Sequence, residues 1–497
     1  MHNKNIVLIG FYNQKAIGVR YLAKALMENG YNPAIIFLKD FNSTGISKPS
    51  NKEIRLLCDV ISKTSPIFIG LSIMTSFYID TVISISKTLK SRFNIPIVWG
   101  GVVPTMFPEK SLNHSDFVIM GEGDEAIVEL ADAIFNKAEY KGIQNLSYKK
   151  DNIVIKNSLR PLTPDINIYG YPEIDNCTMY SIDNQKLSIG DPMRKSLTYE
   201  TSASRGCPYN CSYCCSGSLK KLYPEGSKYV RIRSVDSVIE ELEQAKNKMP
   251  RLKYIYFWDE IFSSSEKWVK EFCSKYKTKI GIPFQIWCHP LMVKEPIIKA
   301  LTDAGLYKAV MGIQSGSPRI RNEIFNRREA NKQILEACRI LHKCKVPHIV
   351  YDFMLQHPFE TIEDIKSTYE LCMQLDPPFE LQLHGLNFLP GTDIVKTAVE
   401  NGIMSPEEAD SLIDKSMDDQ YKKYWGGSES NLQSNYWYSL IYMSQFKGTR
   451  AIAQRLARKN TVLGKPVRNL YNILKVYSKF KNICYNTSLL FRKHSYQ

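Results

Sequence analysis

The sequence predicts an α/β protein with two parallel-sheet domains and a mostly helical C-terminal region. Short apolar runs alternate with helical patterns over residues 1–136 and again over residues 196–395, as is typical of parallel sheets covered by helices. A chain of 497 residues is also too long for one ordinary core. We therefore expect a doubly wound sheet, a connector over residues 137–195, a second α/β domain, and helices over residues 396–497.

The first domain is expected to bind a ligand at one edge of its sheet. Its expected strands are residues 6–9, 34–38, 67–71, 97–99 and 117–120, and its clearest helices are residues 19–28, 79–92 and 124–136. Ligands of doubly wound sheets bind beyond the carboxyl ends of the strands. Polar and glycine residues gather there, and the alternative is that they form ordinary turns. The candidates are Tyr12, Asn13, Ser72, Thr75, Gly100, Gly101, Gly121, Glu122 and Gly123.

The second domain is expected to contain six strand–helix units. The expected strands are residues 197–201, 254–258, 284–288, 308–313, 348–354 and 380–386, and the clearest helices are residues 235–248, 296–304, 330–344 and 362–375. Active sites of β/α barrels lie after the strand ends. The connector before this domain contains an expected hairpin over residues 145–156.

Three cysteines follow the first strand of the second domain. Cys207, Cys211 and Cys214 have the spacing Cys-x-x-x-Cys-x-x-Cys, with Tyr213 before the third. Three thiolates can ligate three irons of a cubane cluster and leave the fourth iron open to a substrate, whereas electron-transfer clusters usually have four protein ligands. The alternative is half of a zinc site that includes Cys215, but no second close pair of cysteines follows.

This spacing, with its aromatic residue, resembles the signature of the radical S-adenosylmethionine (SAM) enzymes. The glycines and polar residues of 70–72, 99–101 and 121–123 resemble the Rossmann-like cobalamin-binding domain of the cobalamin-dependent radical SAM class. Together the resemblances cover about residues 5–395 and imply a partial (β/α)6 barrel that uses a 4Fe–4S cluster, SAM and cobalamin. The Asp-x-His-x-x-Gly motif of other cobalamin proteins is absent, so we expect no histidine ligand to cobalt from the loop after the first strand.

Further motifs of this class follow the later strands. Asp259 and Glu260 stand where the family holds the SAM amino group, although acids are also favoured at helix starts. Gln314 replaces the glutamate of a Glu-Ser-Gly motif that binds SAM. His289 is a candidate substrate-side group, and His357 either faces the cavity or is structural. The SAM candidates are Tyr213, Asp259, Glu260, Gln314, Ser315, Gly316 and Pro390.

The resemblance implies radical methylation of an unactivated carbon, or of phosphorus, in a metabolite, lipid or natural-product intermediate. Cyclisation or rearrangement without methyl transfer is the second hypothesis, and a non-catalytic cobalamin and iron–sulfur sensor is the third. A tRNA methylthiolating enzyme is disfavoured because that family has three further cysteine ligands in its N-terminal domain, whereas Cys58 is the only cysteine in residues 1–136.

The net charge of +15 is unevenly distributed along the chain. Residues 447–497 contain twelve Lys or Arg and no Asp or Glu, which predicts contact with an anionic membrane surface or an acidic carrier, or else a packed helix with a solvated basic face. The sequence shows no signal peptide and no membrane-spanning run. We therefore expect a cytoplasmic protein, in part at the inner membrane face, with a small-molecule or carrier-bound substrate and a flavodoxin, ferredoxin or reductase as electron donor. A nucleic-acid partner is not expected.

Overall fold

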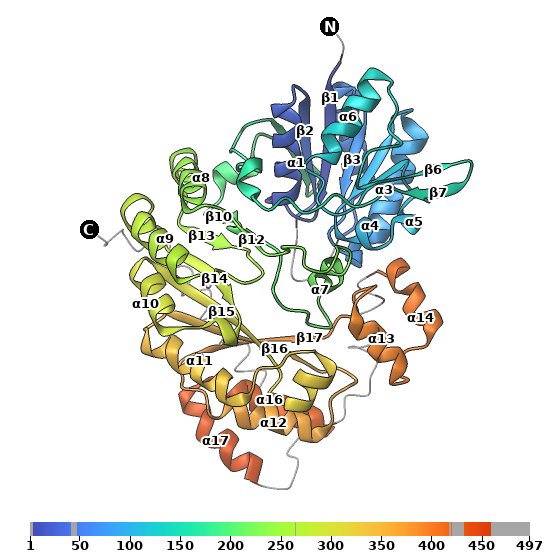
Figure 1. Ribbon diagram of the computed structural model, residues 1–497. Coiled ribbons are helices and arrows are strands. Elements are labelled where there is room, and N and C mark those ends of the chain that lie inside the picture. Colours follow the sequence, from blue (N-terminus) through green and yellow to red (C-terminus); the bar gives the residue numbers. More distant parts are fainter. Residues whose placement is uncertain (1–2, 41–46, 264, 417–418, 420–431, 459–497) are drawn as a thin grey trace.

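The computed structural model describes residues 3–40, 47–263, 265–416, 419 and 432–458. It shows two α/β domains that face each other, with helix α7 (Cys215–Lys220) between them (Figure 1). Short 3₁₀ segments and one π-helical segment connect the larger elements: η1 (Ser76–Tyr78), η2 (Ile166–Tyr169), η3 (Pro192–Lys195), η4 (Pro290–Met292), η5 (Ile320–Ile324) and η6 (Leu412–Asp414).

A parallel sheet covered on both faces forms the centre of the N-terminal domain. Its strands lie in the order β5-β4-β3-β1-β2. They are β1 (Asn5–Phe11), β2 (Asn32–Leu38), β3 (Ile69–Ser72), β4 (Ile97–Gly100) and β5 (Phe117–Ile119). The helices are α1 (Ile17–Glu28), α2 (Asn51–Thr64), α3 (Ile79–Arg92), α4 (Val102–Met106), α5 (Pro108–Ser111) and α6 (Ala126–Asn136). Alternate β1 side chains enter two separate cores, one beneath α2 and α3 and one beneath α1 and α6, which confirms the doubly wound prediction.

Residues 137–195 extend this sheet at both edges. The hairpin expected over residues 145–156 forms β6 (Leu146–Lys150) and β7 (Ile153–Lys156), and it pairs antiparallel to β5. A second hairpin, β8 (Thr178–Asp183) and β9 (Lys186–Ile189), adds to β2 at the opposite edge. The segment predicted as a connector therefore completes a nine-stranded sheet.

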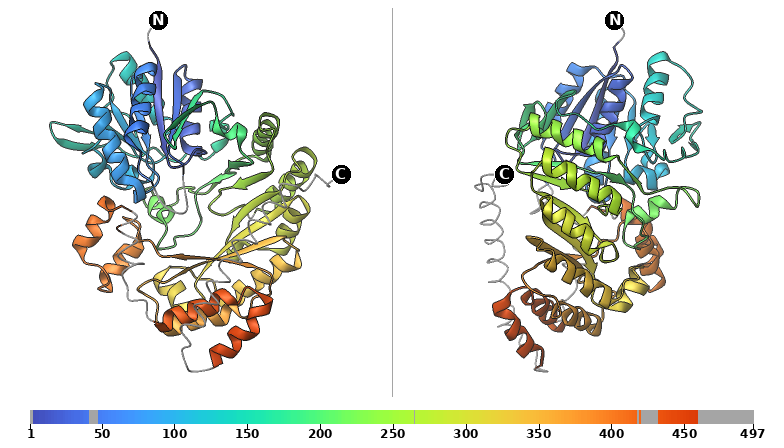
Figure 2. Two further views of the ribbon diagram at one scale, coloured as in Figure 1. Left: turned by 180° about the vertical axis from the view of Figure 1, so that it is seen from behind. Right: turned by 60° about the vertical axis from the view of Figure 1, so that its left-hand side comes forward.

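The second domain contains the expected six parallel strands, in the order β10-β13-β14-β15-β16-β17. They are β10 (Thr198–Thr201), β13 (Tyr254–Phe257), β14 (Phe284–Cys288), β15 (Leu306–Gln314), β16 (His348–Leu355) and β17 (Glu380–Gly385). The covering helices are α8 (Val235–Lys248), α9 (Glu266–Lys279), α10 (Glu295–Asp303), α11 (Asn331–Lys343) and α12 (Ile362–Cys372). Their apolar faces and the helix-facing strand residues form one large core, so the carboxyl ends of the strands are left facing the first domain (Figures 1 and 2).

The C-terminal helices pack on both domains. Helices α13 (Asp393–Glu400) and α14 (Pro406–Ser411) lie beside the first domain (Figure 2), where Lys110 donates a hydrogen bond to the Asp410 carbonyl at 2.8 Å. Helices α16 (Leu432–Met443) and α17 (Lys447–Arg458) lie beside α12 on the outside of the barrel (Figure 1).

The aromatic residues of the C-terminal region, which from the sequence alone could either cap the barrel mouth or pack in a core, fall into two groups. Tyr436 is buried in the barrel core, Trp437 contacts Tyr369 of α12, and the Tyr438 hydroxyl donates to Glu360 at 2.8 Å. These three are core-packing residues. Tyr421, Tyr424 and Trp425, and the basic residues 459–497, lie outside the described residues. In the described part of the chain, no helix is long and apolar enough to cross a membrane.

Glu360 gives the protein a pH-dependent stability. Burial raises the pKa of Glu360 to about 8 and lowers the pKa of the adjacent His357 to about 3. Because the folded protein holds the Glu360 proton more tightly than the unfolded chain, stability is lost as pH rises from about 4.5 to 8. Between pH 6.5 and 8.5 the unfolded His357 loses about half a proton, which offsets only about 0.4 kcal/mol, whereas Glu360 should cost about 2 kcal/mol.

Glu360→Gln is therefore expected to retain a hydrogen bond from Tyr438 and to remove this loss. The measurement is the melting temperature at pH 6.5 and 8.5. Glu363→Gln, three residues further on in α12 with 79% of its side chain accessible, is the control and should behave as the parent does. An unchanged pH profile in Glu360→Gln would show that another group titrates.

Candidate active site

The three predicted cluster ligands lie in one loop closed by a short ribbon. Strands β11 (Ser204–Arg205) and β12 (Arg231–Ile232) pair antiparallel, and the loop of residues 206–230 between them carries all three cysteines. At Gly206 (φ +88°) a Cβ atom would lie 2.3 Å from the Tyr229 carbonyl oxygen, so the loop can begin only with glycine. The carbonyl of Ser212 accepts a hydrogen bond from the Ile394 amide at 2.8 Å, which joins the loop to α13.

The cysteine loop fits an iron–sulfur cluster chemically. Burial, with smaller contributions from Glu260 and the neighbouring cysteines Cys211 and Cys214, raises the pKa of the Cys207 thiol to about 12. A metal offsets this cost because coordinated thiols are deprotonated. Within the described ranges, no three His, Cys, Asp or Glu side chains are placed to bind a single metal ion. A cubane does not need that arrangement, because each cysteine binds a different iron. Cys215 also lies close, since it is hydrogen-bonded to Cys214.

Tyr213 is fixed against the barrel interior. Its ring meets Phe325 edge-on at 5.1 Å between centroids, and its hydroxyl accepts a hydrogen bond from Arg327 at 3.2 Å. Arg327 also donates to the Gly312 carbonyl of β15 at 2.7 Å and pairs with the buried Glu329. The aromatic residue of the cysteine motif is thus attached to the fourth barrel strand.

The structure separates the two acids that follow β13. Asp259 is 2% exposed and accepts hydrogen bonds from the Ala203 amide at 3.0 Å and from the Ser204 hydroxyl. Burial raises its pKa to about 6. Glu260 is exposed, accepts a hydrogen bond from Ser216 of α7 at 2.9 Å, and interacts electrostatically with the cluster cysteines. Asp259 therefore stabilises the segment that leads into the cysteine loop. Glu260 is the acid that remains available to a ligand bound beside this loop.

Glu260→Gln is expected to weaken SAM binding about tenfold, because it removes the charge from a charge-assisted hydrogen bond. The measurement is equilibrium binding of SAM to the iron-reconstituted protein. Asp259→Asn should instead lower the iron content, since Ala203 and Ser204 donate to different oxygens of Asp259 and one of these atoms becomes an NH2 group in asparagine. If the two variants lost the same SAM affinity, measured only on protein that contains the cluster, this division of roles would be contradicted.

Of the predicted Gln314-Ser315-Gly316 motif, only Gln314 offers a free polar atom. A register shift in β15 precedes Gln314, whose φ is +71° and whose buried Oε1 has no hydrogen-bond partner. Ser315 is fully buried and accepts from the Ser317 amide at 3.1 Å. The Gly316 amide donates to Thr368 of α12 at 3.0 Å, where a Cβ would lie 2.3 Å from the Thr368 Cα. Ser315 and Gly316 thus pack this turn against α12.

Two further predicted positions are placed by packing. Pro390 is half-buried in the loop after β17. The neighbouring Gly391 accepts a hydrogen bond from Ser218 of α7 at 3.1 Å and lies against Met106 of the first domain. His289 is 4% exposed and stacks on Tyr209 of the cysteine loop at 3.9 Å between centroids. Burial lowers its pKa to about 3, so His289 is neutral.

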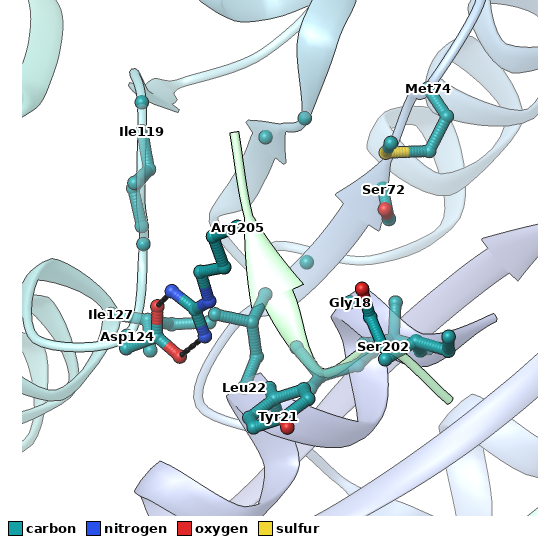
Figure 3. Close-up of a pocket in the computed structure, with 18 of the residues that line it drawn as sticks. Gly18, Tyr21, Leu22, Ser72, Met74, Ile119, Asp124, Ile127, Ser202 and Arg205 are labelled. Atoms are coloured by element: carbon teal, nitrogen blue, oxygen red, sulfur yellow. Dashed lines mark hydrogen bonds and ion pairs between the residues drawn. The ribbon is translucent and has the colours of Figure 1, made fainter. Parts of the chain in front are cut away.

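A cavity of about 350 Å³ lies at the carboxyl ends of β1, β3, β4 and β5 (Figure 3). Its walls are mainly apolar and include Leu8, Val98 and Ile119. Gly101 (φ +105°) lies where a Cβ would be 2.7 Å from the Ile73 carbonyl oxygen, so only glycine is accommodated there. The predicted cobalamin residues that line the cavity are Ser72, Gly100, Gly101, Gly121 and Gly123. An apolar hollow bordered by glycines at strand ends fits part of a large cofactor such as cobalamin.

The other four predicted cobalamin residues make local contacts instead. Tyr12 is 4% exposed and hydrogen-bonds Thr81 at 3.3 Å. Asn13 accepts from the Lys15 amide, Thr75 accepts from the Phe77 amide at the start of η1, and Glu122 pairs with Arg231. Their roles toward cobalamin stay predictions.

The cavity wall includes residues of the second domain that sequence reasoning did not identify. Ser202, Arg205, Arg233 and Trp258 all line it. Trp258 is 44% exposed, stacks on Trp287 at 5.9 Å between centroids, and donates to Glu200 at 2.9 Å. Lys15 of the first domain pairs with Glu200 at 3.1 Å. The sequence gives one indirect signal for this contact between the domains: polar and aromatic residues follow the strands of both.

Comparison with known families agrees with this geometry. A B12 binding domain model matches residues 11–131, and a radical SAM superfamily model matches residues 201–372. The chain therefore carries a B12-binding domain followed by a radical SAM domain, and it is an enzyme of the cobalamin-dependent radical SAM class.

Individual relatives are distant. An uncharacterized methyltransferase of Pyrococcus horikoshii is 29% identical, over 78% of this chain and 79% of the relative. Bacteriochlorophyllide d C-8(2)-methyltransferase of Chlorobaculum tepidum is 23% identical, over 80% and 78%.

Two solved structures share the fold. The radical SAM methyltransferase TsrM of Kitasatospora setae, with cobalamin and a 4Fe–4S cluster bound, has a TM-score of 0.64 at 16% identity over 80% of this chain and 75% of that chain. The cobalamin-dependent radical enzyme OxsB has a TM-score of 0.65 at 13% identity, over 99% and 82%.

Proposed function

We propose that this enzyme transfers a methyl group to an unactivated carbon, or to phosphorus, of a metabolite, lipid or natural-product intermediate. When bound, the cluster and SAM would supply the radical that activates the substrate, and cobalamin would supply the methyl group. The observation that carries the proposal is that Arg205 both lines the glycine-bordered cavity and stands two residues before Cys207. A substrate at the junction would thus meet both cofactors.

The chain's own residues would bind, orient and shield the reactants. Cys207, Cys211 and Cys214 would hold the cluster, Glu260 would accept a hydrogen bond from the SAM amino group, and the free Oε1 of Gln314 would accept one from SAM inside the barrel. Trp258 and Met74, 44% and 55% exposed on the cavity wall, would present an apolar surface to the substrate. Excluding water there prevents side reactions of reactive intermediates.

Methyl transfer is favoured over the second hypothesis by the named relatives. The Pyrococcus and Chlorobaculum relatives, which align over most of this chain, are named methyltransferases. The anaerobic magnesium-protoporphyrin IX monomethyl ester cyclase of Synechocystis, at 28% identity, aligns over only 30% of this chain.

Product analysis tests the proposal. Anaerobically reconstituted protein is given SAM, cobalamin, a strong reductant and candidate substrates. Methyl transfer predicts S-adenosylhomocysteine and 5′-deoxyadenosine in comparable amounts. Deoxyadenosine with little S-adenosylhomocysteine would instead indicate cyclisation or rearrangement, and no SAM cleavage at all would indicate the sensor.

A further inference from the structure

Four charged side chains join the cysteine loop to the loop that lines the cavity. Arg205 and Arg231 are partners in the β11–β12 ribbon that closes the cysteine loop. Glu122 and Asp124 follow β5 in the first domain. We call these four residues the junction clamp.

The clamp has the geometry of specific rather than diffuse ion pairing. Both terminal nitrogens of Arg205 donate to the two carboxylate oxygens of Asp124, at 3.0 and 3.1 Å (Figure 3). Arg231 likewise donates through both nitrogens to Glu122, at 3.1 Å for Nη1. Arg205 also lies 3.3 Å from Glu122, which links the two pairs. Paired contacts of this kind fix the orientation of both partners.

Burial and packing make the clamp stiff. The Arg231 side chain is 1% exposed and that of Asp124 is 7% exposed. The Arg205 guanidinium lies over the rings of Tyr21 and Tyr169, at 5.2 and 4.8 Å from their centroids. Ion pairs withdrawn from water are also screened less by salt than surface pairs. Because the two-point contacts and the enclosing rings hold the Arg205 guanidinium in one place, the two loops should move together.

The clamp connects the two cofactor sites through very short stretches of chain. Gly121, Gly123 and Asp124 line the cavity, as does Arg205. Cys207 is two residues beyond Arg205, and the intervening Gly206 is held against Tyr229. A group that fills the cavity would order the carboxylate loop, and through the arginines it would order the start of the cysteine loop.

We propose that the junction clamp couples the two sites, so that cobalamin in the cavity slows loss of the iron–sulfur cluster. Thermodynamic linkage then requires the assembled cluster to tighten cobalamin binding by the same factor as cobalamin stabilises the cluster. Asp124 and Arg205 act in this proposal as positioning residues. The inference rests on the cofactor assignment and does not depend on methyl transfer.

The test uses the full-length, reconstituted protein without oxygen. Iron release to a chelator is followed with and without bound hydroxocobalamin. In the parent protein, cobalamin should slow iron release, and the equilibrium coupling, measured as hydroxocobalamin affinity with and without the cluster, should be at least about fivefold, the lower end of typical coupling. In Asp124→Asn the ratio of the release rates with and without cobalamin should fall to about one, measured at cobalamin concentrations that saturate the variant. Hydroxocobalamin affinity, measured with and without the cluster, should show the same loss of coupling.

Two further variants make the result decisive. Arg205→Lys keeps the charge but cannot form the two-point contact, so it should also lower the ratio, and it serves if Asp124→Asn does not fold. Glu129→Gln breaks the ion pair to Arg160 on the same domain, at 2.8 Å and 44% side-chain exposure, and should leave the ratio unchanged.

A parent ratio of one, or an Asp124→Asn or Arg205→Lys ratio equal to the parent's, overturns the proposal. Variants that lose cobalamin outright overturn it too, because the residues would then only form the cavity wall. These readouts are independent of S-adenosylhomocysteine formation, so failure of the coupling and failure of the proposed function are distinguishable.

Discussion

Cys211→Ala is expected to abolish reductive SAM cleavage, while the protein still takes up cobalamin. Two thiolates cannot hold three irons of a cubane, and Cys211 is not among the residues that line the cavity. The variant should contain little iron, lack the visible absorbance of a 4Fe–4S cluster, and release no 5′-deoxyadenosine with dithionite. The cobalamin affinity of the variant, measured spectroscopically, should equal that of the parent protein without its cluster.

Cys215→Ala is the matched control, because Cys215 is hydrogen-bonded to Cys214 but falls outside the three-cysteine spacing. It should retain the cluster and SAM cleavage. If Cys215→Ala lost its metal as completely as Cys211→Ala, and if the bound metal were zinc, the three-ligand cluster would be the wrong assignment.

Gly100→Leu is expected to lower cobalamin affinity about ten- to a hundredfold, because overpacking a site costs binding energy. Gly100 lines the cavity, and the nearest neighbour of a Cβ there would be the Ile119 carbonyl oxygen at 3.7 Å. The backbone therefore tolerates a side chain, while the leucine branches would occupy cofactor space. The measurement is hydroxocobalamin binding to the purified protein.

Gly142→Leu provides the control, since position 142 has open space around a Cβ and lies away from the cavity. It should bind cobalamin as the parent does, and both variants should retain iron. Normal cobalamin affinity in Gly100→Leu would remove the cavity as the cobalamin site.

Several features could be read from the sequence because local patterns carry them. The period of the apolar residues predicted the five parallel strands of the first domain, the hairpin over residues 145–156 and the six strands of the second, all of which the structure contains. The cysteine spacing and the glycines at strand ends identified both candidate cofactor loops.

Other features depend on side-chain direction, which a sequence pattern does not specify at strand ends. Asp259 and Glu260 are adjacent, but one faces the Ala203 amide and the other faces α7. Ser315 and Gly316 pack on α12, and Gln314 alone keeps an unpartnered oxygen because a register shift turns the strand at that point. Such a shift is set by the neighbouring strand and helix.

The sequence by itself determined the class of this protein, since the cysteine spacing, the glycines at strand ends and the alternation of strands and helices are carried by short segments whose order along the chain can be read directly. Only the tertiary structure decided how the two domains meet. Arg205 and Asp124 are 81 residues apart, and Arg231 and Glu122 are 109 apart, so nothing local relates them. Opposite charges at such separations meet only when both sheets have formed and their carboxyl edges face each other, because the tertiary fold alone brings the two loops within hydrogen-bond distance.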